Sequence, residues 1–531
     1  MIQAEAATQR HIVRNAAVVG ASFAIALALG VVRNALIARQ FGIGADLDAY
    51  YAAFKLPDLL FAIVAGGALA TAFIPIFADF ESTGDRAGAW RLTSAVTNWV
   101  VLITAGLAVL AALAAPWLVS TVIAPGFEAA QQAETVALMR LLLISTVIFG
   151  ISAVQGSALH GFKHFLFPAL AAAAYPLGVI AGAIWLAPTW GVLGLAMGAV
   201  AGSLLHLLIK VPALLYYGFR WWPILDAPHH AVRRVAVLMG PRVLDLALFQ
   251  LTLLATTNLA SRLAPGSVSA VEWGWDAMQL PETIIGTAFG VVAFPTLAEL
   301  AARGDRDGLR SALADSLRMM LVLAVPATIG LIMLGRPLIQ TLYQRGAFDS
   351  QATDAVYVAL RFFALGLVGH CCLELAARAF FAQKDTVTPL LVAAGSAGLN
   401  IALGVVLMQP LAHGGLALAN SIAVTAEVGV LLALLSWRLE GIEGRETLGM
   451  LVRVLAASLI MAVAIGAVKL GMSRAGADGL AAALLAAAAG AGVYVIVSLM
   501  LGVDELRALA AALTPARRSS LARSLAGDPQ E

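Results

Sequence analysis

The chain has few charged residues: Asp, Glu, Lys and Arg together make up 12% of its 531 positions. A soluble domain has roughly 25%. Hydrophobic residues reach 61% and the mean hydropathy is +0.90, so we expect an integral membrane protein. Apolar runs of about 20 residues recur along the whole length, which predicts membrane-spanning α-helices and not a barrel. The formal net charge of only +2 gives no reason to expect a nucleic-acid partner.

Cysteine is nearly absent, and enzyme motifs are absent. The two cysteines, Cys371 and Cys372, are adjacent within an apolar run, where neighbours make a poor disulfide, so we interpret them as small core residues. The sequence has no phosphate-binding Gly-Lys-Ser/Thr loop, no His-Glu-x-x-His and no cysteine pair at metal-binding spacing. We therefore expect neither an enzyme nor a bound cofactor, and no nucleotide hydrolysis within this chain.

Hydropathy and helix-breaking residues predict an all-α polytopic membrane protein with about fourteen transmembrane helices. The predicted spans are 15–40, 50–79, 90–114, 133–159, 165–187, 191–216, 232–262, 268–300, 309–334, 353–381, 388–408, 414–437, 447–470 and 478–501. Arg10 and Arg14 before the first apolar run resemble a secretory signal, but because many spans follow we predict an uncleaved first helix.

Lysine and arginine are concentrated in alternate connections between these spans. The intervening loops GIGADLD, APGFEAAQQAE and APTW contain neither residue. The positive-inside rule therefore predicts that both termini lie in the cytoplasm, in agreement with an even number of helices. The polar tail from Asp504 is predicted to be a solvated segment or, alternatively, a basic helix on anionic membrane lipid.

An internal duplication indicates the domain organisation. The segment FIPIFADFESTGDRAG (73–88) matches AFPTLAELAARGDRDG (293–308) at a shift of 220 residues, and matches at a shift of 221 continue beyond it. Each copy holds about six helices, an even number, so the copies share one orientation about an axis along the membrane normal. The predicted parts are an N-terminal lobe (1–220), a C-terminal lobe (221–440), helices thirteen and fourteen (441–503) and a cytoplasmic tail (504–531). Two parallel six-helix lobes around a central cavity are typical of a transporter that works by alternating access.

The stretch Gly30–Gly67 is apolar yet contains several ionisable residues: Arg33, Arg39, Asp46, Asp48, Lys55 and Asp58. An ionised side chain at bilayer depth costs at least about 2.5–3.5 kcal/mol, so such residues usually face a bundle interior or a water-filled cavity. This stretch therefore predicts a polar cavity beside the first two helices.

The same stretch resembles the opening signature of the MurJ/MviN lipid II flippases. The resemblance covers nearly the whole chain. The residues that carry it are Gly30-Val-Val-Arg33-Asn-Ala-Leu-Ile-Ala-Arg39-Gln-Phe-Gly42, Asp48, Ala53-Phe-Lys55-Leu-Pro57, Ala124-Pro-Gly-Phe127, Gly240-Pro241, Gly266-Ser-Val-Ser269, Pro281, Leu342-Tyr-Gln-Arg-Gly-Ala-Phe348 and Gln383-Lys-Asp-Thr-Val-Thr-Pro389. The resemblance implies a fourteen-helix fold of the multidrug/oligosaccharidyl-lipid/polysaccharide exporter superfamily. It also implies peptidoglycan biosynthesis at the bacterial cytoplasmic membrane, by flipping an undecaprenyl-pyrophosphate-linked disaccharide-pentapeptide, with cell-wall synthesis proteins as partners.

Several family cations are missing from this chain. Leu27 stands where the family has an arginine, Leu60-Phe61-Ala62 replaces a Leu-Arg-Arg element, Gly66 replaces an acidic residue, and Asp276 aligns with an arginine. The function we expect from the resemblance is still the flipping of lipid II, and these departures favour, as the alternative, a flippase for another lipid-linked oligosaccharide. A cation-coupled drug antiporter and a transport-dead paralogue that acts as a scaffold for cell-wall enzymes are also compatible with the sequence.

The first-lobe candidates for binding the lipid-linked anionic substrate are Arg33, Lys55, Arg39 and Asp48. Arginine suits a pyrophosphate because its planar fork donates two parallel hydrogen bonds. Each candidate also has a possible structural role. Arg33 would pair with an acidic residue or snorkel, Arg39 would point to the outer interface, Lys55 would pair with Asp58 next to a kink at Pro57, and Asp48 would cap the second helix.

In the second lobe, the candidates are Arg242 and Asp276. Arg242 or Arg361 would replace a missing arginine. Alternatively, Arg242 would form a local pair with Asp245. Asp276 would repel a pyrophosphate if it faced the cavity. Some relatives bind sodium, and Asp245, Asn400 and Asn420 offer oxygen ligands for such a hard cation. Transport could be coupled to sodium, to protons or to the membrane potential.

Overall fold

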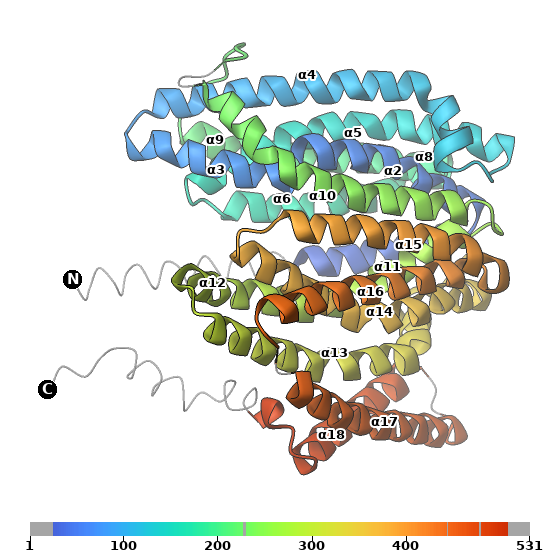
Figure 1. Cartoon of the computed structure of the whole chain (residues 1–531). Helices are drawn as coiled ribbons and strands as arrows, with labels where there is room; N and C mark the ends of the chain where they lie inside the picture. Colours follow the sequence, from blue (N-terminus) through green and yellow to red (C-terminus); the bar gives the residue numbers. More distant parts are fainter. Residues whose placement is uncertain (1–24, 227–229, 443, 477–478, 508–531) are drawn as a thin grey trace, which may run out of the picture. The chain divides into compact units, whose positions relative to one another are not determined.

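The protein is helical throughout the part that the computed structural model describes, which comprises residues 25–226, 230–442, 444–476 and 479–507 (Figure 1). Thirteen helices of these residues are long and apolar enough to cross a membrane. The first predicted span, 15–40, is described only from residue 25, as a helix over 25–41. The prediction of an all-α polytopic membrane protein is therefore confirmed.

The chain forms two compact units. The first unit comprises residues 1–270 and 342–352, and the second comprises 271–341 and 353–531. These units do not coincide with the predicted lobes, because α10 (Ala231–Ala260) packs on α2 and α3 and so joins the first unit. The duplicated lobes and the cavity between them stay predictions.

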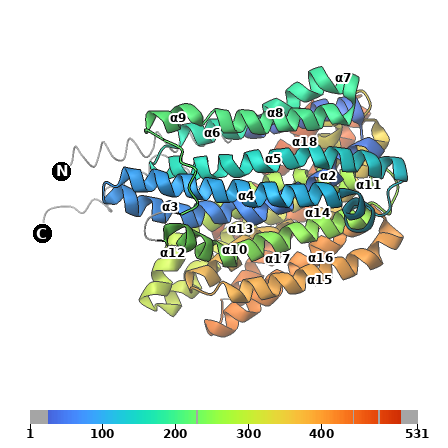
Figure 2. The ribbon, with the colours of Figure 1, turned by 90° about the horizontal axis from the view of Figure 1, so that it is seen from above.

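The first unit consists of antiparallel helices in close contact, with α4 beside α5 and α6 beside α8 (Figure 2). Its helices, after the one over 25–41, are α2 (Ala45–Ala65), α3 (Gly67–Ser82), α4 (Arg86–Leu118), α5 (Ala129–Gly161), α6 (Leu166–Ala181), α7 (Ala187–Trp190), α8 (Val192–Leu208), α9 (Val211–Tyr216), α10 and the start of α11 (Ser267–Glu282). Single π-turns extend α4 over Val119–Ile123 and α6 over Gly182–Leu186.

The second unit contains the remaining helices. They are most of α11, a π-turn over Thr283–Thr287, α12 (Ala288–Arg303), α13 (Arg306–Tyr343), α14 (Ser350–Ala382), α15 (Val387–Leu411), α16 (His413–Arg438), α17 (Gly444–Arg474) and α18 (Leu480–Met500). Helix α15 packs on α16, and α17 packs on α18. The predicted tail beyond residue 507 lies outside the described residues.

The duplicated sequence segments adopt the same local structure in both units. Asp85 accepts a hydrogen bond from the backbone N–H of Gly88 at 2.8 Å at the start of α4, and Asp305 accepts one from Gly308 at 2.9 Å at the start of α13. The glycines before these aspartates, Gly84 and Gly304, have φ values of 76° and 71°, a region that favours glycine. The two Gly-Asp-Arg segments are thus equivalent helix-to-helix turns.

The second predicted span is interrupted at a glycine. Helix α2 continues through Pro57 and ends at Ala65, and α3 begins at Gly67. Between them Gly66 has φ −62° and ψ −174°, which is extended backbone. The interruption of this span therefore lies at Gly66, while α2 is continuous through Pro57, where the predicted kink stays a prediction.

Candidate functional site

Arg33 lies on the helix over 25–41 and is half-buried in the first unit. Its Nε donates a hydrogen bond to Asn34 Oδ1 at 3.0 Å, and Asn34 is itself buried. The charges of Arg33 and Asp58 both act on the hydroxyls of Tyr50 and Tyr175, two tyrosines from α2 and α6. Arg33 therefore lies within electrostatic range of two phenols, Tyr50 and Tyr175, as does Asp58, whose side chain is exposed.

Lys55 is the most deeply buried of the predicted cations whose side chains the structure describes in this unit. Its side chain is 4% exposed on α2, two residues before Pro57. Asp58, one turn further on, is exposed. An ammonium buried in a membrane-spanning helix costs free energy and is usually retained for function, so Lys55 stays a candidate for substrate binding.

Arg39 has a structural role through its main chain, while its side chain is exposed. The carbonyl oxygen of Arg39 accepts a hydrogen bond from the N–H of Ala347 at 2.9 Å. Gly42, with φ 62°, lies so close to Ala347 that an added Cβ would be 2.5 Å from its carbonyl oxygen. The resemblance motif around Ala347, whose Phe348 is 1% exposed, thus fastens residues 342–352 to the end of the first helix.

Asp48 was predicted to cap the start of its own helix, but it does not do so. Helix α2 has no side-chain cap at Gly44. Instead the buried Asp48 carboxylate accepts hydrogen bonds from the N–H of Gly266 at 2.6 Å, the N–H of Ser269 at 2.7 Å and the Ser269 hydroxyl at 2.7 Å. The orphan N–H groups at the start of α11 attract this carboxylate because it supplies both acceptors and negative charge. Asp48 therefore holds the Gly-Ser-Val-Ser segment, and its oxygens are occupied by protein donors.

The other predicted substrate ligands are placed only in part. Arg242 belongs to α10, but its side chain lies outside the described residues, so its predicted pair with Asp245 is not placed; Asp245 is exposed. Asp276 is half-buried in α11. Arg361, the second possible replacement cation, is exposed and its guanidinium lies 4.9 Å from the centroid of the Phe362 ring.

The predicted sodium ligands are divided between the two units. Asp245 lies in the first unit, whereas Asn400 and Asn420 lie in the second. Asn400 is 6% exposed, and Asn420 Oδ1 shares a hydrogen bond with His370 Nε2 at 3.0 Å. Among the described residues, no group of three or more His, Cys, Asp or Glu side chains is arranged to hold a metal. The sodium site stays a prediction.

The sequence analysis missed a buried polar cluster, which consists of Lys210, Ser152 and His206. Lys210, between α8 and α9, is 2% exposed, and its Nζ donates to the carbonyl oxygen of Ser152 on α5 at 2.6 Å. The Ser152 hydroxyl shares a hydrogen bond with His206 Nδ1 at 2.7 Å. No carboxylate of the described chain forms an ion pair with Lys210. The signal was available in the sequence, because His206 and Lys210 are four residues apart in an otherwise apolar span.

Comparisons with known proteins identify relatives along most of the chain. A family model described as "Lipid II flippase MurJ" matches residues 37–487. The lipid II flippase MurJ of Burkholderia cenocepacia is 31% identical over 423 residues, which cover 78% of this chain and 81% of that protein. A probable lipid II flippase MurJ of Rhizobium meliloti is 29% identical over 470 residues, 86% of each chain.

Solved structures show the same fold. A lipid II flippase MurJ in an inward closed conformation superposes with a TM-score of 0.76 and 23% identity, covering 92% of this chain and 99% of that one. An inward-facing multidrug transporter of the MATE family gives a TM-score of 0.68 at 14% identity, covering 78% and 95%. The fold implied by the resemblance is therefore confirmed.

Proposed function

Because the chain belongs to the lipid II flippase MurJ family, we propose that it flips lipid II across the bacterial cytoplasmic membrane by alternating access. The observation that carries this proposal is the placement of two cations in the first unit: Arg33 is half-buried on the helix over 25–41, and Lys55 is buried in α2, which belongs to a stretch long and apolar enough to cross a membrane. Their chemistry matches the dense negative charge of a lipid pyrophosphate. The relatives are transporters, and no chemical step is assigned to any residue.

Arg33 is proposed as the principal pyrophosphate ligand. Its guanidinium donates five N–H groups in a planar fork, and Asn34 orients that fork through Nε. Tyr50 and Tyr175 lie within electrostatic range of Arg33 and would add hydroxyl groups to the site.

Lys55 is proposed to contribute a second positive charge. Lysine binds phosphate as a point charge on a flexible stem, without the directionality of arginine. Asp48 is not proposed as a substrate contact, since three protein donors already occupy its carboxylate. Arg39, Arg242 and Asp276 stay candidates on the basis of sequence alone.

A second candidate substrate is another lipid-linked oligosaccharide. The family pattern has an arginine at the positions of Leu27 and Asp276 and an acidic residue at the position of Gly66. A head group with a different charge distribution would suit these substitutions. Cell-wall synthesis proteins are proposed as partners, and both termini are proposed to lie in the cytoplasm, as the distribution of loop lysines and arginines indicates.

Rescue of a bacterial strain depleted of its own lipid II flippase tests the proposal. Wild-type protein should restore growth, Arg33→Ala should not, and Arg33→Lys should restore it partly because the charge remains without the fork. The control is Arg303→Ala, which removes an exposed arginine paired with Glu299. Failure of the wild type to rescue, with normal membrane insertion, would favour the second substrate; full rescue by Arg33→Ala would remove Arg33 from the site.

The source of energy is proposed to be an ion gradient or the membrane potential. Moving one charge through the potential is worth about 2.3 kcal/mol per 100 mV, which is enough to bias a lobe that carries buried cations. Replacing sodium by choline, and collapsing the potential with an ionophore, separates these two sources in reconstituted vesicles.

A further inference from the structure

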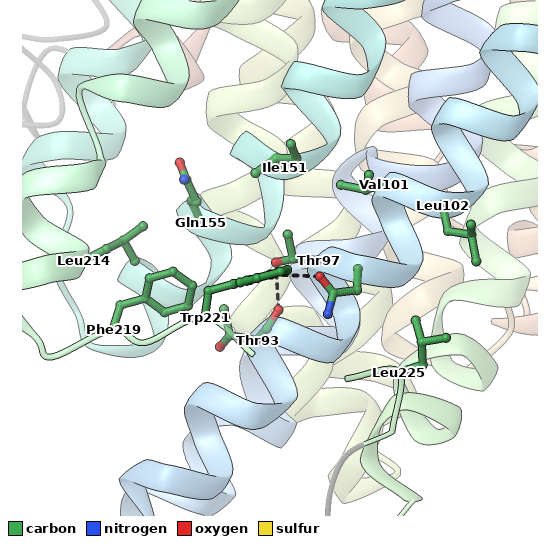
Figure 3. A pocket seen from close by; sticks show the side chains of 11 residues that line it. Thr93, Thr97, Val101, Leu102, Ile151, Gln155, Leu214, Phe219, Trp221 and Leu225 are labelled. Carbon is green, nitrogen blue, oxygen red and sulfur yellow. Dashed lines mark hydrogen bonds between the residues drawn. The ribbon is translucent and has the colours of Figure 1, made fainter. Parts of the chain in front are cut away.

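A pocket of about 510 Å³ lies in the first unit between α4, α5 and the segment 217–226 that follows α9 (Figure 3). We propose that this pocket binds an anionic glycerophospholipid, phosphatidylglycerol, from the surrounding bilayer. The site is distinct from Arg33 and Lys55, which do not line it. The bound lipid would be a resident ligand and not the transported substrate.

One wall of the pocket is a loop fastened to α4 by side-chain hydrogen bonds. Asn98 Nδ2 donates to the carbonyl oxygens of Trp222 at 2.8 Å and Ile224 at 2.7 Å, and the Asn98 Oδ1 accepts from Trp221 Nε1 at 2.9 Å. Trp99 Nε1 donates to the carbonyl oxygen of Leu225 at 2.8 Å. The segment 217–226 is therefore a preformed wall, which lowers the entropic cost of binding.

The polarity of the pocket changes in the same direction along both helices. On α4, Thr97 and Asn98 lie nearer the Arg86 end, and Val101 and Leu102 lie about one turn deeper in the span. The same order occurs on α5, which runs antiparallel to α4, so that its Gly161 end lies beside the Arg86 end of α4. There the polar Gln155 is nearer to Gly161 than the apolar Ile151 is. A phospholipid has this order of groups, with its head group at the interface and its acyl chains towards the centre of the bilayer.

Gln155 provides an unsatisfied polar group in this pocket. Its Oε1 is buried and has no hydrogen-bond partner among the described residues. A buried carbonyl oxygen without a donor is unfavourable, because it has lost its hydrogen bonds to water and gained none in return. An occupant with a hydroxyl donor would remove that cost. The glycerol head group offers neutral hydroxyls, whereas an ammonium group would have to be buried as a charge at a larger cost.

The pocket has exposed apolar side chains in its lining, as a pocket open to lipid would have, and positive charge lies nearby in the sequence. Leu102 is 55% exposed and Trp221 is 58% exposed, and both line the pocket. Arg220 is exposed between the lining residues Phe219 and Trp221, and Arg91 is exposed two helical turns before Asn98 on the same face of α4. These arginines suit a lipid phosphate and favour an anionic lipid over a zwitterionic one.

Native mass spectrometry of the full-length protein, purified in detergent and mixed with equal amounts of phosphatidylglycerol and phosphatidylcholine, tests this proposal. Wild-type protein should retain phosphatidylglycerol roughly fivefold or more over phosphatidylcholine. Val101→Trp, which fills the pocket, should abolish that retention, and Gln155→Leu, which keeps the volume but removes the carboxamide, should reduce it roughly fivefold. Arg220→Gln should lower the preference for the anionic lipid.

The matched control is Leu110→Trp, which places the same side chain on α4 at an exposed position that does not line the pocket. It should retain lipid as the wild type does, and the melting temperature of each variant identifies any that misfold. Equal retention of both lipids by the wild type, or undiminished retention by folded Val101→Trp and Gln155→Leu, would overturn the proposal. The experiment measures no transport, so its failure would leave the flippase proposal standing.

Discussion

Replacing Asp48 tests whether this residue serves the structure or the substrate. Asp48→Ala removes three hydrogen bonds to a buried carboxylate and leaves the N–H groups of Gly266 and Ser269 without acceptors. Hydrogen bonds to charged groups contribute roughly 1.5–3 kcal/mol each, and such contributions are not additive. We expect a loss of roughly 3–5 kcal/mol in the free energy of unfolding, the range found when one partner of a buried ionic contact is deleted.

Asparagine should give an intermediate result. Asp48→Asn keeps one acceptor oxygen, but its NH₂ group would face an N–H donor, so we expect a loss of roughly 1–3 kcal/mol. Asp46→Ala is the matched control, because Asp46 is an exposed acidic residue in the first turn of the same helix. Its contribution through the helix dipole is below about 1 kcal/mol.

The assay is the melting temperature of detergent-purified protein, measured by fluorescence-detected size exclusion after heating. Asp48→Ala should melt roughly 3–5 °C below the wild type, Asp48→Asn between the two, and Asp46→Ala near the wild type. An unchanged melting temperature for Asp48→Ala would refute the structural role. Loss of lipid flipping by Asp48→Asn at an unchanged melting temperature would instead make Asp48 a substrate contact.

Three further predictions concern charged groups elsewhere. Lys55→Met should abolish rescue of a flippase-depleted strain, whereas Lys469→Met, which removes a half-buried lysine bonded to a backbone carbonyl, should rescue; equal rescue would contradict the role of Lys55. Lys210→Met should lower the flipping rate of reconstituted protein at least roughly tenfold, because a cation buried in a membrane protein is usually retained for function. The melting temperature should not fall, since removing a buried charge that has no ion-pair partner costs little stability. A lower melting temperature with normal flipping would make Lys210 structural. Burial raises the pKa of Asp385, but hydrogen bonds from Thr388 and the charge of Arg438 outweigh it and lower that pKa to about 2. This stabilisation is present above about pH 4 and is lost as the pH falls towards about 2, so Asp385→Asn should lower the melting temperature at neutral pH but not near pH 2; an equal effect at both values would contradict it.

The sequence predicted the helical architecture well because that architecture depends on composition and periodicity. Apolar runs of bilayer length, interrupted by turn residues, determine where helices form, and the duplicated Gly-Asp-Arg segments are indeed equivalent turns capped by Asp85 and Asp305. Single residues such as glycine and proline were weaker guides to where a predicted helix is interrupted. The interruption at Gly66 was missed because Gly66 and Gly67 lie within a continuous apolar run, which predicted one uninterrupted span over 50–79.

Roles that depend on contacts between distant segments could not be read from one sequence. Asp48 looked like a local cap because it lies at the start of a helix, but its partners at Gly266 and Ser269 are 218 and 221 residues away. The contact between Ser152 and Lys210 also joins distant segments, although the spacing of His206 and Lys210 did signal polar residues in that span. Arg33, by contrast, was singled out from its type and setting, because ionisable residues in apolar spans usually have a functional role, and its role in substrate binding stays a prediction.

Binding of lipid II to the purified protein, compared between wild type and Arg33→Ala, is the decisive test of the pyrophosphate assignment. Arg33→Ala loses a bidentate charge-assisted contact, so its dissociation constant for lipid II should be roughly ten- to a hundredfold higher than that of the wild type, with an unchanged melting temperature. A dissociation constant for folded Arg33→Ala equal to that of the wild type would show that this arginine does not hold the pyrophosphate.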